Sequence, residues 1–201
     1  MVTVVVGAGG KTTLIRELSA RYRAQGKRVL VTTSTHMFRE RHTLVDAEAA
    51  ELVTVLQTEG FAMAGSTAAE GKIGPLPPGL YAAACAAADE VLVEADGARG
   101  HLVKLPRAGE PVIFDNVTDI VLVINLKAEG LPLRVAAHHP EQVAAALGVA
   151  QDTPLTPALL GRLTALYRAH LRSNWPDKQL RLHLNYRPHQ QALAAALMGG
   201  Q

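Results

Sequence analysis

The hydrophobic positions of this chain fall into short apolar runs separated by longer segments with helical features. Runs rich in valine, isoleucine and leucine predict strands at residues 2–6, 28–33, 61–64, 90–95, 119–125 and 179–185. Helical periodicity, or helix-start and helix-stop residues, predicts helices at 11–24, 46–58, 80–88, 140–147, 157–171 and 188–198. Residues 65–79 are rich in glycine and proline and predict an exposed loop.

Strands that alternate with helices predict an α/β fold in which a mostly parallel sheet lies between two layers of helices. The length of 201 residues and the hydrophobic content of 48% are sufficient for one well-packed domain. We therefore predict a single domain over residues 1–201, with a small C-terminal elaboration. A helical subdomain is predicted at about residues 128–175, where no strand pattern occurs.

Composition excludes several classes of protein. No apolar run approaches the length of about 20 residues that a membrane helix needs, so we expect no membrane partner. The net charge is only +2, which argues against nucleic acid as a partner. Cys85 is the one cysteine, which excludes an internal disulfide and, together with the absence of a secretory signal pattern, predicts a cytoplasmic protein.

The strongest chemical signal lies where the first predicted strand ends. The run Gly7-Ala8-Gly9-Gly10-Lys11-Thr12-Thr13 follows Val4-Val5-Val6 and leads into the first predicted helix. Glycines let backbone N–H groups turn toward an anion, and the helix adds its positive N-terminal dipole. In such loops the lysine reaches the β- and γ-phosphates and the next hydroxyl binds Mg²⁺. We therefore expect this run to bind nucleotide phosphates, within a three-layer fold like that of P-loop NTPases.

This loop is shorter than the standard phosphate loop. The pattern G-x-x-x-x-G-K-[ST] requires glycine where Val5 stands. The remaining spacing, G-x-x-G-K-T-T, resembles the ATP loop of the Mur ligase family. A dinucleotide fingerprint fits less well, because Thr12 occupies the place of its third glycine or alanine. A turn that only joins strand to helix is the simpler alternative, but it gives no reason for Lys11-Thr12 directly after the glycines.

Two acids follow a later apolar strand and complete the predicted site. In Val91-Leu92-Val93-Glu94-Ala95-Asp96, alternation of an extended chain predicts that both carboxylates point to the same face. The carboxyl ends of parallel strands share one edge of the sheet, where the loop also lies. We expect Glu94 or Asp96 to join Thr12 in binding Mg²⁺ and the other to orient an attacking group. Polar residues that simply end a strand are the alternative.

Further polar residues are candidates for binding a second substrate or stabilising charge. The second strand ends in Thr32-Thr33-Ser34-Thr35-His36, from which we select Thr33, Thr35 and His36. Arg99 and Lys104 follow the acids in a glycine-flanked loop and would stabilise developing charge, and Lys72 is a further candidate. Strand-end capping and solvated loops explain the same residues without a ligand. His138-His139 has no companion at ligand spacing and is left unassigned.

Taken together, these motifs resemble the YqeC family. The resemblance rests on the glycine loop, the Thr-Thr-Ser-Thr-His strand end and Glu-Ala-Asp-Gly-Ala-Arg-Gly followed by Lys104, and it covers about residues 2–150. Here His139 replaces an arginine of the family pattern, and Asn185 is followed by Tyr186-Arg187-Pro188 instead of a segment with aspartate. The family is described as accessory proteins for selenium-dependent molybdenum hydroxylases, which implies a molybdenum hydroxylase or its cofactor as a partner.

Three functions remain open at this point. The first is a Mg²⁺-dependent P-loop NTPase that binds ATP in preference to other nucleotides, with Lys11, Glu94, Asp96 and Arg99 as candidate catalytic residues. The second is an ATP-dependent ligase or kinase acting on a small acid or cofactor precursor. The third is a nucleotide switch whose C-terminal part docks a client protein. From residue 151 on, that part carries six basic residues against two acidic ones: Arg162, Arg168, Arg172, Lys178, Arg181 and Arg187 against Asp152 and Asp177.

Overall fold

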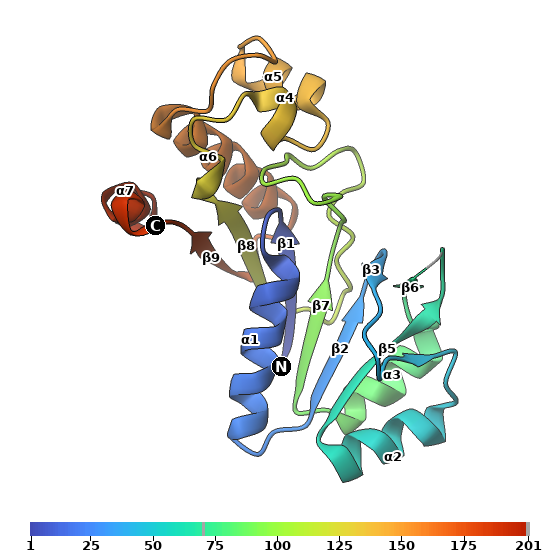
Figure 1. Cartoon of the computed structure of the whole chain (residues 1–201). Coiled ribbons are helices and arrows are strands. Elements are labelled where there is room, and N and C mark those ends of the chain that lie inside the picture. Colours follow the sequence, from blue (N-terminus) through green and yellow to red (C-terminus); the bar gives the residue numbers. More distant parts are fainter. Residues whose placement is uncertain (70, 200–201) are drawn as a thin grey trace. The chain divides into compact units, whose positions relative to one another are not determined.

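The computed structural model describes residues 1–69 and 71–199, shown in Figure 1. This part of the chain forms two compact units that are interleaved in sequence. The first unit comprises residues 1–5, 12–97 and 111–120, and the second comprises residues 6–11, 98–110 and 121–201. The structure confirms a mixed α/β fold.

The first unit is built around strands that lie side by side in the order β3-β6-β5-β2-β7-β1. Its central strands pair in parallel, whereas the short strand β6 runs antiparallel to both of its neighbours. The strands are β1 (Val2–Gly7), β2 (Val29–Thr33), β3 (Met37–Phe38), β4 (Leu44–Val45), β5 (Phe61–Thr67), β6 (Lys72–Gly74) and β7 (Glu90–Glu94). Strand β4 pairs in parallel with β5 outside this order.

Three helices cover the strands of the first unit. They are α1 (Lys11–Ala24), α2 (Ala49–Glu59) and α3 (Pro78–Ala87). Helices α2 and α3 pack against each other (Figure 1). Helix α2 ends at Gly60, which takes a left-handed conformation, and its Leu52 and Leu56 are fully buried.

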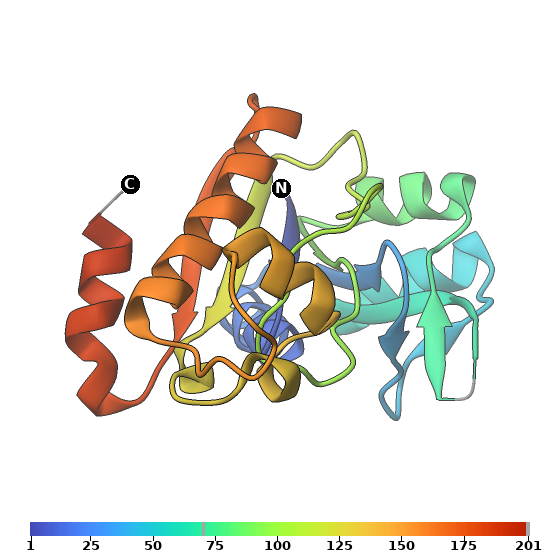
Figure 2. The ribbon, with the colours of Figure 1, turned by 90° about the horizontal axis from the view of Figure 1, so that it is seen from above.

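The second unit contains β8 (Asp119–Asn125) from residue 121 on, and β9 (Gln179–Asn185) beside it. Its helices are the single 3₁₀ turns η1 (Leu126–Ala128) and η2 (Pro188–Gln190), and α4 (Leu133–Ala136), α5 (Pro140–Leu147), α6 (Pro157–Asn174) and α7 (Gln191–Gly199). Helix α6 lies alongside β8 and β9 (Figure 2). It begins at Pro157, where the Thr156 hydroxyl accepts the N–H of Leu159, a favourable N-terminal cap.

Most predicted elements are confirmed, and the largest difference falls at residues 65–79. The prediction of a loop there is wrong, because β5 continues to Thr67 and turns back into β6. Ile73 of β6 is fully buried, and it lies so close to Gly65 that a Cβ on that glycine would stand 2.8 Å from it. Residue 70, which the same prediction covered, lies outside the described residues. The short strands β3 and β4 were also not predicted.

Candidate functional site

The glycine loop of the second unit leaves β1 as a tight turn. Gly7, Gly9 and Gly10 all have positive φ angles, which favour glycine. The N–H of Ala8 donates to the carbonyl of Val123 on β8, so it is engaged within the fold. Within the described part of the chain, the N–H groups of Gly9 and Gly10 donate no hydrogen bond. The loop therefore presents two successive N–H groups that could donate hydrogen bonds to an anion.

Lys11 lies across this loop instead of extending into solvent. Its residue is only 5% exposed, and its ammonium donates to the carbonyl of Gly7 at 3.1 Å. Helix α1 begins at Lys11, so the helix N-terminus follows the glycines directly. Thr13, in the first turn of α1, is exposed. The positive charge, the free amides and the helix start therefore lie in one short segment of the chain, and its binding of phosphate stays a prediction.

Two asparagines that sequence reasoning did not assign hold the loop from the side of β8 and β9. The side-chain amides of Asn125 and Asn185 both donate to the carbonyl of Gly9, at 2.7 and 2.9 Å. A Cβ on Gly10 would stand 2.0 Å from Nδ2 of Asn185, so only glycine fits at that position. No local spacing in the sequence signals these contacts, because the partners are 116 and 176 residues apart.

The first unit places Glu94 at the end of β7, between the ends of β1 and β2. Val5 on one side and Thr33 on the other are its register partners. The Thr12 hydroxyl donates to Oε2 of Glu94 at 2.7 Å. A hydroxyl and a carboxylate are therefore in contact, and both are hard oxygen ligands of the type that Mg²⁺ takes in proteins. The sequence predicted that Glu94 or Asp96 would bind the metal together with Thr12, and that role stays a prediction.

Asp96 does not extend the alternation of β7, because the strand ends at Glu94 and Asp96 has a left-handed φ of 53°. Its Oδ1 accepts a long contact of 3.5 Å from the N–H of Val112. The argument that alternation points both acids to one face therefore does not apply here. The structure describes Glu94, not Asp96, in contact with the Thr12 hydroxyl, and a metal role for Asp96 stays a prediction.

The threonines at the end of β2 brace the acid strand. The Thr33 hydroxyl donates to the carbonyl of Glu94 at 2.7 Å, and the Thr35 hydroxyl accepts the N–H of Asp96 at 3.2 Å. Between them, the Ser34 hydroxyl is buried and has no hydrogen-bond partner in the described part of the chain. His36 is exposed. The Ser34 hydroxyl is therefore a buried oxygen without a partner near Glu94. An oxygen of this kind could bind a hard cation such as Mg²⁺ or one of the waters around it.

The remaining predicted residues are dispersed. Lys72 lies on β6, three strands from β7, with its ammonium over the ring of Phe38. Arg99 is exposed in the second unit and has a left-handed φ of 47°. Lys104 is almost fully buried and forms an ion pair with Glu110 at 3.0 Å. The ammonium of Lys104 is therefore already neutralised within its own unit.

In the second unit, the ring of His101 lies near His138, a proximity that the sequence did not indicate. The rings of His101 and His138 lie 5.7 Å apart, and those of His138 and His139 lie 4.2 Å apart. Burial, and then electrostatic interaction with His139 and Lys104, lower the pKa of His138 to about 4. Within the described residues, no group of three or more histidine, cysteine, aspartate or glutamate side chains is placed to hold a metal ion.

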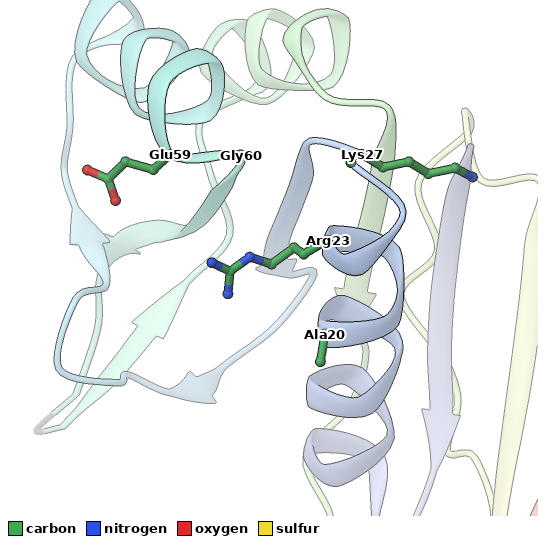
Figure 3. Close-up of a pocket in the computed structure, with 6 residues that line it drawn as sticks. Ala20, Arg23, Lys27, Glu59 and Gly60 are labelled. Carbon is green, nitrogen blue, oxygen red and sulfur yellow. The ribbon is translucent and has the colours of Figure 1, made fainter.

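A surface pocket of about 380 Å³ lies at the other edge of the first unit's strands (Figure 3). It is lined by the ends of α1 and α2 and the turns after them, through Ala20, Arg23, Gly26, Lys27, Glu59 and Gly60. The side chains of Glu59 and Lys27 extend in opposite directions (Figure 3). The residues that line the pocket come just before β2 and β5 in the chain, whereas Glu94 and Asp96 lie at the end of β7 and after it. None of the predicted site residues lines the pocket.

No helix in the described ranges is both long and apolar enough to cross a membrane. Comparison with solved structures finds no significant match. The family model described as "YqeC protein" matches residues 3–141. A curated relative, "Uncharacterized protein YqeC" of Escherichia coli (strain K12), is 33% identical in an alignment of 172 residues that covers 82% of this chain and 66% of that protein. The chain thus spans slightly less than two thirds of that relative, and it belongs to the YqeC family.

Proposed function

We propose that this protein is a Mg²⁺-dependent P-loop nucleotide-binding protein that hydrolyses ATP. The observation that carries the proposal is the loop itself: Lys11 lies over a turn whose Gly9 and Gly10 amides are available, at the start of a helix. Phosphates bind where free backbone amides, a lysine and a helix N-terminus converge. Catalysis in such sites rests on positioning and on neutralising charge, without a covalent intermediate.

Thr12 and Glu94 are the residues proposed to hold Mg²⁺. Their oxygens are 2.7 Å apart, and Mg²⁺ is ordinarily bound by one or two protein oxygens together with phosphates and water. When bound, Mg²⁺ would neutralise phosphate charge, and Thr12 and Glu94 would hold it in place. Glu94→Gln should remove most of the gain in ATP affinity that Mg²⁺ provides, measured by calorimetry with MgCl₂ and with EDTA. An unchanged gain would show that Glu94 is not a metal ligand.

Lys11→Ala tests the phosphate role of the loop. A charge-assisted hydrogen bond contributes about 1.5–3 kcal/mol, so we expect the variant to bind ATP·Mg at least about tenfold more weakly in calorimetry. Lys178→Ala is the matched control, because that lysine forms an ion pair with Asp177 before β9 begins, away from the loop in sequence. If Lys11→Ala binds ATP·Mg as tightly as the parent, the phosphate assignment is wrong.

We further propose that the nucleotide serves maturation of a selenium-dependent molybdenum hydroxylase in the cytoplasm. The support is membership of the YqeC family together with the resemblance of the loop, the acid strand and Lys104 to its pattern. The proposed partner is a molybdenum hydroxylase or its cofactor. Phosphate release should therefore rise when the purified client is added. No change in turnover or in client activity would contradict an accessory role.

A nucleotide switch is the second candidate, and the link between the loop and the C-terminal part favours it. The side chain of Asn185, at the end of β9, is hydrogen-bonded to the carbonyl of Gly9. Helix α7 begins a few residues after Asn185. A change at the loop on nucleotide binding would therefore reach the helices that end the chain. Affinity capture of the client should differ between ATP·Mg, ADP·Mg and no nucleotide. Capture that is equal in all three conditions would exclude the switch.

A further inference from the structure

The carbonyl of Gly9 is held by two side-chain amides that come from different strands. Asn125 Nδ2 donates to it at 2.7 Å from the end of β8, and Asn185 Nδ2 donates at 2.9 Å from the end of β9. A backbone carbonyl has two acceptor positions, so the two asparagines can saturate it. This carbonyl is therefore fixed in direction by side chains outside the loop.

The peptide that carries this carbonyl lies between two glycines. Gly9 has a φ of 70° and Gly10 a φ of 138°, and neither residue has a side chain that would restrict rotation of the peptide. In a trans peptide the C=O and the next N–H point in opposite directions. By fixing the Gly9 carbonyl, the asparagines also fix the N–H of Gly10, which points away from them.

The direction of this peptide decides whether the loop attracts or repels an anion. With the carbonyl on the asparagines, the N–H of Gly10 is free to donate to a phosphate oxygen, as in other anion-binding turns. After a flip, the carbonyl dipole would face the anion instead. Two flanking glycines make that flip easy, so the loop needs an external group to select one orientation.

We propose that Asn125 and Asn185 are positioning residues that lock the Gly9–Gly10 peptide in the orientation that binds the polyphosphate of a nucleotide. The proposal rests on the proposed function and deepens it. It predicts that both residues act on the phosphates alone and do not recognise the base. Any ligand that carries a diphosphate group should therefore depend on them to the same degree.

Asn185 is the better residue to replace. Asn125 also accepts the N–H of Lys127 through Oδ1 at 3.0 Å, so its removal would disturb the turn after β8 as well. Among the described residues, the only other side chain within hydrogen-bond distance of the Asn185 amide is His183, whose Nε2 lies 3.3 Å from Oδ1. Asn174→Ala is a matched control, because that exposed asparagine donates to a carbonyl at the end of α6.

The experiment compares the calorimetric affinity of ATP·Mg and of inorganic pyrophosphate·Mg for the parent and for Asn185→Ala. Loss of one neutral hydrogen bond corresponds to about a fivefold weakening. We expect that factor for both ligands and no change for Asn174→Ala. An unchanged affinity for pyrophosphate overturns the proposal, and a loss confined to ATP would assign Asn185 to the base instead.

A measurement on the parent protein does not depend on the variant folding. In ¹⁵N NMR spectra, pyrophosphate·Mg should shift the Gly10 amide strongly while the side-chain NH₂ of Asn185 keeps its hydrogen-bonded shift. A Gly10 amide that does not respond to a bound ligand overturns the proposal. If the parent binds neither ligand, the proposed function fails, and this proposal fails with it. If the parent binds and Asn185→Ala binds equally well, only this proposal fails.

Discussion

The substitution Glu110→Gln removes the charge that compensates an almost fully buried lysine. The Lys104 side chain is 1% exposed, and its ammonium lies 3.0 Å from Oε2 of Glu110. Arg107 binds Oε1 of the same carboxylate at 2.7 Å. Burial acts to raise the pKa of Glu110, but the hydrogen bonds from Arg107 and Lys104 and the charge of Lys104 together outweigh it and lower the pKa to about 2.

The magnitude follows from this shift. A fall from the ordinary pKa of 4.5 to about 2 corresponds to an upper limit of about 3 kcal/mol. The Arg107 side chain is 52% exposed, so solvent weakens its share. In the variant, Lys104 stays buried without a counter-ion, a situation that costs about 3–5 kcal/mol in buried pairs. We expect Glu110→Gln to lower the free energy of unfolding by about 2–4 kcal/mol at pH 7.

The contribution of Glu110 to the free energy of unfolding depends on pH. The folded pKa of Glu110 lies below the unfolded value, so its contribution is present above pH 4.5 and is lost as the pH falls toward 2. Urea unfolding followed by the fluorescence of the one tryptophan, Trp175 in the same unit, measures it. The difference between parent and variant should shrink to less than about half at pH 3.

An exposed carboxylate provides the control for this experiment. Glu141 is 63% exposed and lies 3.3 Å from His139, so Glu141→Gln should cost less than about 1 kcal/mol. Equal stability of Glu110→Gln and the parent at pH 7 would refute the reasoning. A difference that is as large at pH 3 as at pH 7 would also refute it, because it would have a cause other than the charge.

Three further predictions concern the loop, the core and a histidine. Gly10→Ala should reduce affinity for ATP·Mg at least about tenfold in calorimetry while circular dichroism stays unchanged, because its Cβ would stand 2.0 Å from the Asn185 amide; equal affinity would contradict this. Leu163→Ala should cost about 2–5 kcal/mol in urea unfolding because Leu163 is fully buried, against less than about 1 kcal/mol for the 41% exposed Leu166. The pKa of His138, lowered to about 4 by burial and by electrostatic interaction with its neighbours, should be below 5 in an NMR titration, and the protein should lose stability as the pH falls from 6.5 toward 4; a measured pKa near 6.5 would contradict this.

Where local chemistry decides an element, the sequence predicted it to the residue. Strand β8 occupies 119–125 and helix α5 occupies 140–147, as expected. An apolar run marks the strand, whereas Pro140 at the start and Gly148 after the end mark the helix. Strands β3 and β6 have two and three residues. Their pairing depends on contacts across the sheet, which leave no periodic pattern in so short a segment.

The candidate site shows the same division. The sequence singled out the glycine loop, Thr12 and Glu94 because a short motif and a strand end carry their chemistry; Thr12 and Glu94 are in contact, and their role as site residues stays a prediction. The parity argument for Asp96 failed because it assumed an extended chain, and a left-handed residue follows the strand instead. The asparagine contacts to Gly9 were missed because an isolated asparagine at a strand end has no distinctive spacing, and its partner is set by the sheet order.

The bond between residues 9 and 185 also bears on how the protein is made. The loop is synthesised before the strand that holds its carbonyl, because Asn185 follows Gly9 by 176 residues. At ordinary rates of translation, this interval is on the order of ten seconds or more. A chain interrupted before β9 would carry the complete motif without the strand that shapes it. Under the proposed function, such a chain would bind nucleotide more weakly than the finished, folded molecule.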